Sequence, residues 1–270
     1  MTTATIRSEV LASAVACLGA LDGVDAIYLS GSLAEKTEDQ YSDIDLRVVV
    51  ADSAYESVRA LREHLPTTWG PFLFHETVAE NLTVTYYESL TKADVFYFAA
   101  GALTPSPWFN IGTRVLLERS GHLRTVLAAS EGLEFTATPH EIVGHLQKCV
   151  AGLVESAKRV RRGEAIYASR LCAEAVHHLL VADDLLSNRA PLGSSKRERL
   201  VPGDLTQLAR SSIGAPTIVD SQAYFSALSA PLRQLLSQAQ SQGHCTGLTA
   251  SRLSAALDQL VVLAGGSNCT

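Results

Sequence analysis

The chain has 270 residues, which is long for one compact core and fits two domains. Apolar residues make up 47% of the sequence and charged residues 19%, so neither half has the composition of a disordered segment. The formal net charge of −6 argues against a general nucleic-acid-binding protein, because such proteins need a basic surface to neutralise phosphates.

The charge is distributed unevenly along the chain. Residues 1–120 contain 8 Lys and Arg against 16 Asp and Glu, a net charge of −8, whereas residues 121–270 contain 14 against 12, a net charge of +2. An acidic half followed by a slightly basic half suits a cleft whose ligand has both cationic and anionic parts. An asymmetry of this size carries little weight by itself.

The cysteines indicate a reducing compartment. Their number is odd and none form a C-x-x-C pair, which is typical of reduced cytoplasmic thiols and not of a disulfide framework or a zinc knuckle. The five are Cys17, Cys149, Cys172, Cys245 and Cys269. The apolar segment 10–21 has helical spacing, so we expect an amphipathic first helix there and not a secretory signal. No segment approaches the roughly 20 apolar residues that span a bilayer, and we expect no membrane partner.

In chain order, the first half alternates helices and strands. Apolar residues repeat at helical spacing in the two predicted helices, and the predicted strands are rich in β-branched and aromatic residues. We expect helices over 5–21 and 53–65, and strands within 25–32, 43–50, 72–78, 82–89, 92–100 and the start of 114–127. This alternation predicts an α/β (α+β) domain with a mixed sheet.

The second half contains no convincing strand. Thr138 and Pro139 are typical of a helix start, as N-cap and first helical residue. We expect helices over 139–162, 164–187, 204–212, 221–241 and 247–264, with a loop rich in Pro, Gly and Ser over 187–204. The sequence therefore predicts two domains, residues 1–128 with the sheet and residues 129–270 as an all-α helical bundle.

Two carboxylates stand at the head of the strand over 43–50. Because side chains alternate between the two faces of a strand, Ile44, Leu46, Val48 and Val50 form one apolar face, and Asp43 and Asp45 share the other with Arg47. The Cα atoms of such an i, i+2 pair lie roughly 7 Å apart, so both side chains can reach one cation. Asp94 opens a later strand in the same way. If the two strands are neighbours, three carboxylates meet at one end of the sheet.

Close carboxylates need a counter-charge. Two like charges about 4 Å apart repel by about 4 kcal/mol at an effective dielectric constant near 20, so such a cluster takes up protons or binds a cation. An all-oxygen ligand set suits Mg²⁺, and a pair of such ions supports phosphoryl or nucleotidyl transfer. The alternative for Asp43 and Asp45 alone is a solvated strand end.

Gly31 and Ser32 stand just before this acidic strand. A glycine where a strand turns into a helix lets backbone N–H groups approach an anion, and the serine hydroxyl adds a donor. A lone Gly-Ser pair has little meaning. Its place, directly after an apolar strand and ten spacer residues before Asp43, favours a turn that holds a phosphate near the carboxylates.

The combined pattern resembles the nucleotidyltransferase superfamily of the DNA polymerase beta type. More narrowly, "GSLAEKTEDQYSDIDL" looks like the antibiotic nucleotidyltransferases, which adenylylate aminoglycosides or lincosamides. The helical segment 159–200 is similar to the C-terminal domain of those enzymes. One departure concerns Glu35-Lys36, which stands where a small residue or an Arg beside Gly is common.

The resemblance implies a role for each matching position. Asp43 and Asp45 would ligate Mg²⁺, and Asp94 would either complete the metal site or accept the proton of the acceptor hydroxyl. Gly31 and Ser32 would hold the nucleotide phosphates. Lys36 and, from the second domain, Lys196 would be further phosphate contacts.

Other residues have plainer explanations that the sequence leaves open. Glu155, Glu164 and Glu174 are alternative general bases on the early helices of the second domain, and each is more often a solvated helix acid. Trp69 and Trp108 could stack on an adenine or line an acceptor pocket, although core or rim packing is the commoner role of such side chains.

The predicted protein is thus a cytoplasmic nucleotidyltransferase that uses two Mg²⁺ ions and ATP. It transfers AMP to a hydroxyl of a small acceptor, with an aminoglycoside-type antibiotic as the first choice, because an acidic cleft favours a polycation. Two alternatives remain open: a nucleotidyltransferase that modifies a protein or RNA, and a degenerate module that binds a nucleotide without reacting.

Overall fold

A computed structural model describes residues 3–211 and 221–265. The chain divides into two compact units, Met1–Leu133 and Glu134–Thr270, and each is described by itself. The boundary predicted after residue 128 falls within the helix His122–Ser130, whereas the division in the structure follows that helix.

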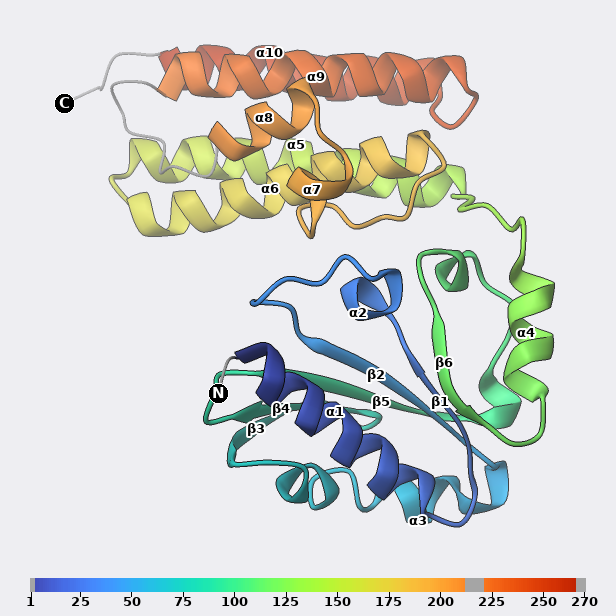
Figure 1. The fold of residues 1–270 in the computed structure, drawn as a ribbon. Helices are drawn as coiled ribbons and strands as arrows, with labels where there is room; N and C mark the ends of the chain where they lie inside the picture. The colour runs from blue at the N-terminus through green and yellow to red at the C-terminus, as the bar shows by residue number, and fades with distance from the viewer. Residues whose placement is uncertain (1–2, 212–220, 266–270) are drawn as a thin grey trace. The chain divides into compact units, whose positions relative to one another are not determined.

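The first unit is built on a six-stranded mixed sheet with the strand order β3-β4-β5-β2-β1-β6 (Figure 1). Strands β2 and β5 are parallel, and the other neighbouring pairs are antiparallel. The strands are β1 (Val24–Leu29), β2 (Ile44–Val50), β3 (Phe72–Ala79), β4 (Leu82–Tyr87), β5 (Lys92–Ala99) and β6 (Arg114–Glu118). The helices are α1 (Thr3–Gly19), α2 (Gly31–Glu35), α3 (Tyr55–Arg59) and α4 (His122–Ser130), with short 3₁₀ turns at Asp52–Ala54, Leu65–Thr68, Ala100–Ala102 and Pro107–Asn110.

Helix α1 covers one face of this sheet. Val10, Ala14 and Leu18 recur every four residues, and each is at most 1% exposed. They pack in one cluster with the even-numbered side chains of β2, which are Ile44, Leu46, Val48 and Val50. The predicted apolar face of the strand over 43–50 is therefore confirmed. The opposite face is buried only in part, by a smaller cluster that includes Val49 and residues of α4.

The helix predicted over 53–65 is much shorter in the structure. Only α3 is α-helical there, between a 3₁₀ turn at Asp52–Ala54 and turns that lead to Pro66. Val58 and Leu65 are the two buried apolar residues of the segment, while Leu61 is 37% exposed. An isolated short helix needs a continuous buried face to be stable, and this segment lacks one.

The second unit is helical, as predicted, and its described part contains no strand. Its helices are α5 (Pro139–Arg161), α6 (Ala165–Leu186), α7 (Arg197–Leu200), α8 (Asp204–Ser211), α9 (Ser221–Ser241) and α10 (Gly247–Gly265). Thr138 accepts a hydrogen bond from the backbone N–H of Glu141, whose carboxylate accepts one from the Thr138 N–H in return. This capping box fixes the predicted start of α5.

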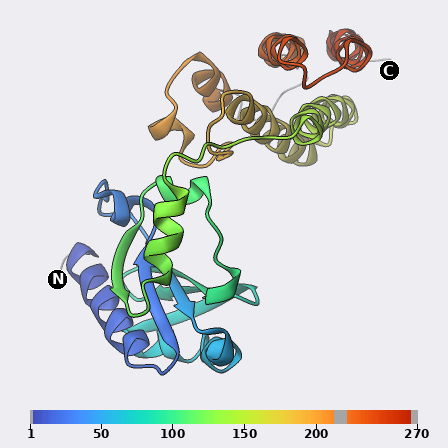
Figure 2. The same ribbon diagram turned by 90° about the vertical axis from the view of Figure 1, so that its right-hand side faces the viewer.

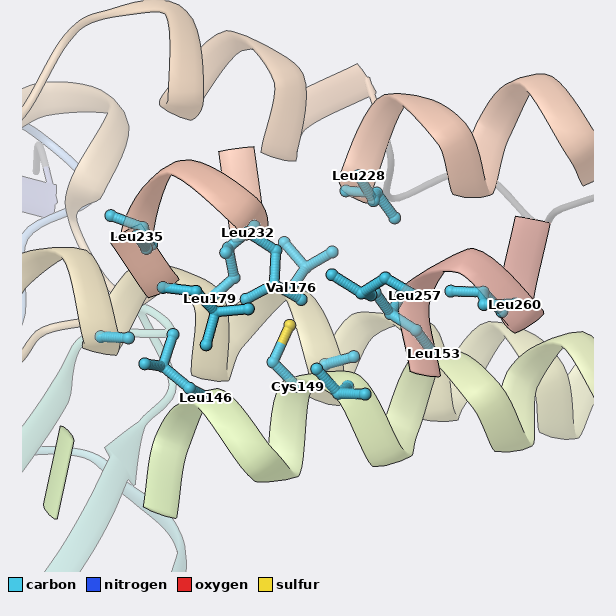
Figure 3. Close-up of a cluster of buried hydrophobic side chains, with 14 of the residues drawn as sticks. Leu146, Cys149, Leu153, Val176, Leu179, Leu228, Leu232, Leu235, Leu257 and Leu260 are labelled. Carbon is cyan, nitrogen blue, oxygen red and sulfur yellow. The ribbon is translucent and has the colours of Figure 1, made fainter. Parts of the chain in front are cut away.

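The four long helices of the second unit enclose its core. Figure 2 shows them close to end-on, with α9 and α10 as a neighbouring red and orange pair. Figure 3 shows the side chains that fill the space between them, among them Leu146, Cys149 and Leu153 of α5. In the described part of the chain, no helix is both long and apolar enough to cross a membrane.

Candidate active site

The parallel pairing of β2 and β5 brings the predicted acidic residues together. Asp45 is the direct register partner of Asp94, and Leu46 is the partner of Val95. Asp43 precedes the first residue of β2 and shares the face of Asp45, because the two are two positions apart along the strand. All three carboxylates therefore belong to the sheet face opposite α1, where the two central strands begin.

Lys92 joins two of these acids. Its Nζ donates hydrogen bonds to Oδ2 of Asp43 at 2.9 Å and to Oδ2 of Asp94 at 3.1 Å. Burial by itself lowers the pKa of Lys92, but the two carboxylates outweigh it, so the pKa stands above its ordinary value and the ammonium stays charged. A lysine therefore supplies the counter-charge that the acid cluster requires.

The carboxylates suit a magnesium ion in their chemistry. All three are hard oxygen donors, and Oδ1 of Asp94 is buried with no hydrogen-bond partner, so this oxygen is available to a ligand. Within residues 3–211 and 221–265, however, no three His, Cys, Asp or Glu side chains converge as a ready-made metal site. The ammonium of Lys92 lies between Asp43 and Asp94 instead. The donor set fits Mg²⁺ in its chemistry, and the ammonium of Lys92 is bonded to two of its oxygens.

The turn after β1 stands beside the acidic strand. The backbone N–H of Ser30 donates to the carbonyl oxygen of Asp45 at 3.0 Å, which ties this turn to β2. Gly31 has a φ of 65°, a left-handed conformation that explains the glycine. Ser32 is buried, and its carbonyl oxygen accepts the N–H groups of Lys36 and Thr37. A phosphate contact by Gly31 or Ser32 stays a prediction.

Lys36 closes the short helix α2. It has a φ of 58° and is exposed, so its side chain is available to a ligand while its backbone forms a left-handed cap. Glycine adopts this backbone conformation with the least strain. The predicted triphosphate contact of Lys36 is not decided by its position.

An aromatic pocket adjoins the acids on the same face. Arg47 and Phe96 follow Asp45 and Asp94 by two residues on their strands, and the Arg47 guanidinium lies over the Phe96 ring at 4.1 Å from its centroid. The pocket has a volume of about 570 Å³. It is lined by Tyr28, Ser30, Arg47, Phe96, Phe98, Ala102, Leu103, Thr104, Ser106, Trp108, Phe109 and Thr113. No carboxylate lines it, so the space beside the acids is apolar and carries one cation.

The two tryptophans have different surroundings. Trp69 is 3% exposed and belongs to the core beneath α1, whereas Trp108 is 50% exposed and lines the pocket. Burial raises the pKa of Tyr28, another lining residue, to about 12, so its hydroxyl stays protonated near neutral pH. Of the two tryptophans, only Trp108 can contact a ligand in the pocket.

In the second unit, Lys196 follows a loop that is firmly anchored. Lys196 is exposed with a φ of 56°, and the next residue, Arg197, is 3% exposed. Arg197 donates to Oδ1 of Asp184 at 2.6 Å and also contacts Asp183. The backbone N–H of Gly193 donates to the other oxygen of Asp184 at 3.1 Å. The conformation is thus well defined, and the phosphate contact of Lys196 stays a prediction.

The alternative bases of the second unit are all in ion pairs. Glu155 pairs with Lys158 at 2.6 Å, Glu164 with Arg159 at 2.8 Å and Glu174 with Arg170 at 2.5 Å. These pairs are typical of solvated helix surfaces, and the hydrogen bond from Lys158 lowers the pKa of Glu155. They favour the plainer explanation of the three acids.

Sequence reasoning missed Lys92 and the pocket. A signal for Lys92 was available, because it precedes Asp94 by two residues and therefore shares its face. Nothing local indicated that its ammonium would reach Asp43. The pocket is formed by residues from β1, β2, β5 and the segment 102–113, whose meeting depends on the tertiary fold.

A mixed sheet with acids on two parallel central strands and a Gly-Ser turn beside them is the arrangement that the resemblance to the nucleotidyltransferases of the DNA polymerase beta type predicts. Residues 12–88 match the family described as "Nucleotidyltransferase domain". This range includes Gly31, Asp43 and Asp45, and ends before Asp94. The chain therefore contains a nucleotidyltransferase domain, which spans part of its first unit.

The chain is similar to the crystal structure of an aminoglycoside 6-adenyltransferase from Bacillus subtilis, with 10% sequence identity and a TM-score of 0.40 over 94% of this chain and 97% of that one. A similarity at this level does not bear on the substrate. No curated protein matches the chain significantly.

Proposed function

We propose that the protein transfers AMP from ATP to a hydroxyl of a small molecule in a Mg²⁺-dependent reaction. A bond forms between the acceptor oxygen and the α-phosphorus, the bond from the α-phosphorus to the pyrophosphate oxygen breaks, and the hydroxyl proton leaves. The observation that carries this proposal is the register pairing of Asp45 with Asp94 on parallel strands, with Asp43 bonded to the same lysine as Asp94.

Each predicted site residue of the first unit would have its own role in this reaction. Asp43, Asp45 and Asp94 would hold two Mg²⁺ ions, which when bound neutralise the phosphates and lower the pKa of the attacking hydroxyl. Asp94 has a second possible role as the proton acceptor, since its Oδ1 is buried and unpartnered. Gly31 and Ser32 would orient the phosphates, and positioning supplies much of the rate enhancement in such reactions.

The acceptor is proposed as an antibiotic of the aminoglycoside type. The support is the resemblance of the segment 31–46 to the antibiotic nucleotidyltransferases and the net charge of −8 over residues 1–120, which attracts a polycation. The aromatic pocket limits which part of the acceptor can enter it. Its lining of rings and Arg47 suits an apolar or planar group and not an ammonium group. Charged amino groups of the acceptor would therefore bind outside the pocket.

The test is an activity panel with the full chain. The protein is incubated with Mg-ATP and a set of aminoglycosides and lincosamides, and pyrophosphate release is measured. The expected result is release that depends on both Mg²⁺ and one acceptor class, with a product heavier by one AMP in mass spectrometry. Asp45→Asn is the matched negative control.

Negative results distinguish the alternatives. No release with any of these acceptors would reject the antibiotic substrate. Labelled ATP with a cell extract then tests for modification of a protein or RNA, which would show as a labelled macromolecule. Tight Mg-ATP binding in calorimetry without turnover on any acceptor would instead indicate a nucleotide-binding module.

A further inference from the structure

The position of Lys92 raises the question of what an ammonium does among metal-binding carboxylates. Its Nζ is bonded to Asp43 at 2.9 Å and to Asp94 at 3.1 Å, and its side chain is 24% exposed. These are two of the three acids proposed to ligate Mg²⁺. Lysine is a cation with three hydrogen-bond donors, so it satisfies two carboxylates as a divalent ion would, with half the charge.

The strand geometry makes this contact specific. Lys92 and Asp94 lie on the same face of β5, and the parallel register pairs Ala93 with Ile44 and Asp94 with Asp45. Continued by one residue, that register sets Lys92 beside Asp43. The pairing of β2 with β5 that brings the acids together therefore also places Lys92 beside them.

The other charged group at this place does not duplicate the role of Lys92. Arg47 interacts electrostatically with Asp45 and Asp94, but its guanidinium lies over the ring of Phe96 and donates to the Leu46 carbonyl oxygen. It faces the pocket, whereas Lys92 is bonded directly to the carboxylate oxygens. Of the cations that contact Asp43 and Asp94 in the described residues, Lys92 is the one that competes for a metal position.

We propose that Lys92 is a resident counter-cation, which holds Asp43 and Asp94 in place in the metal-free protein and competes with the divalent ion for both. The inference rests on the proposed metal-binding role of the three acids. An ammonium and a divalent ion repel each other and need the same oxygens, so the lysine must leave when the metal binds. Its long, partly exposed side chain permits this without movement of the backbone.

Two consequences follow for the enzyme. Free metal ions bind weakly, because every binding event must first break two charge-assisted hydrogen bonds. The carboxylates nevertheless stay oriented without metal, since Lys92 is bonded to both of them. The site is thus ready for an ion that arrives with the nucleotide.

The test measures Mn²⁺ binding to the full chain by the electron paramagnetic resonance signal of free Mn²⁺, without nucleotide. We expect Lys92→Met to bind Mn²⁺ at least about tenfold more tightly than the wild type, because the competitor is gone while all three carboxylates remain. Lys92→Arg retains the charge and should stay within about threefold of the wild type. Lys148→Met, which removes an exposed lysine of α5, is the matched control and should change nothing.

A thermal unfolding readout separates this role from a merely structural one. Without metal, Lys92→Met should lower the melting temperature by a few degrees, because the two acids lose their shared counter-charge. Added Mn²⁺ should raise the melting temperature more in Lys92→Met than in the wild type. A structural lysine would lower it equally with and without metal.

The outcomes separate failure of this inference from failure of the proposed function. Unchanged or weaker Mn²⁺ binding by Lys92→Met overturns the role of Lys92 and leaves the metal site intact. If neither protein binds Mn²⁺ without nucleotide, the role of Lys92 is refuted, and Mg²⁺-dependent pyrophosphate release then decides the proposed function separately. If Lys92→Met does not fold, acetic anhydride labelling of the wild type decides: saturating Mg²⁺ should raise labelling of Lys92 relative to Lys148, and equal labelling would refute the inference.

Discussion

At the scale of single residues, Asp45 and Asp94 matter most. Each lies on a central strand, and they are paired across the parallel junction of β2 and β5. In the proposed reaction this pair would hold the cation, and an asparagine at either position keeps the shape of the side chain while it removes the charge that a cation needs.

We therefore expect Asp45→Asn and Asp94→Asn each to lower kcat by roughly 10³-fold, a loss typical of removing one charged group that stabilises a transition state. Steady-state pyrophosphate release measures the effect, and circular dichroism checks the fold. Asp22→Asn, in the exposed turn after α1, is the control and should keep full activity. Retention of activity by Asp94→Asn would exclude it as base and as metal ligand.

Lys36 allows the backbone and the side chain to be tested separately. Its φ of 58° is unfavourable for any residue with a Cβ, so Lys36→Gly should raise the free energy of unfolding by up to about 1 kcal/mol. Urea unfolding measures this gain. If the ammonium contacts the triphosphate, the same variant binds ATP more weakly, whereas Lys36→Arg retains affinity. Equal ATP affinity in all three proteins would remove Lys36 from the site.

At the scale of elements, the contact between α5 and α6 carries a pH dependence. Nδ1 of His145 and Nδ1 of His178 are 3.0 Å apart, so one ring donates and the other accepts, and the two rings cannot both be doubly protonated without loss of this bond. Burial lowers the pKa of both histidines, and the charges of Lys148 and His177 lower each pKa further. Glu141 opposes the shift of His145, and Glu174 opposes that of His178.

The lowered pKa values of the two histidines determine how the stability changes with pH. Both pKa values are lower in the folded state, so the unfolded chain binds more protons just below its own histidine pKa of about 6.5. The free energy of unfolding should thus be largest above pH 6.5 and fall as the pH drops through that value. Urea unfolding at pH 7.5 and 5.5 measures the decrease. His178→Gln should reduce it, and an equal decrease in the variant would contradict the assignment.

At the scale of the whole molecule, the two units have separate cores. Among the described residues, one cluster of buried apolar side chains contains residues of the second unit alone, and two others contain residues of the first unit alone. Since cooperativity of unfolding follows shared buried contacts, each unit should unfold as its own cooperative block.

Differential scanning calorimetry should therefore show two transitions. Leu46→Ala in β2 and Leu153→Ala in α5 are a matched pair, because the two leucines are 0% and 1% exposed. Each substitution should lower the free energy of unfolding of its own unit by about 2–5 kcal/mol. It should therefore lower the melting temperature of one transition only. A single transition that moves with both variants would show that the units unfold together.

The sequence by itself determined the local elements and the residue types of the site. Alternation fixed the buried face of β2, helical periodicity fixed α1, and Thr138-Pro139 fixed the start of α5, because each of these signals acts between residues close in the chain. Helical spacing also predicted one helix over 53–65, and this prediction was wrong in length. The segment has helical spacing but no continuous buried face.

Only the tertiary structure decided which strands are neighbours and what lies between their side chains. The register of β2 against β5 joins segments about fifty residues apart, and no local pattern encodes it. The same pairing sets Lys92 between Asp43 and Asp94 and brings Arg47 and Phe96 to one pocket. Such contacts arise from packing energies summed over the whole sheet, which is why the sequence could name the acids but not their counter-ion.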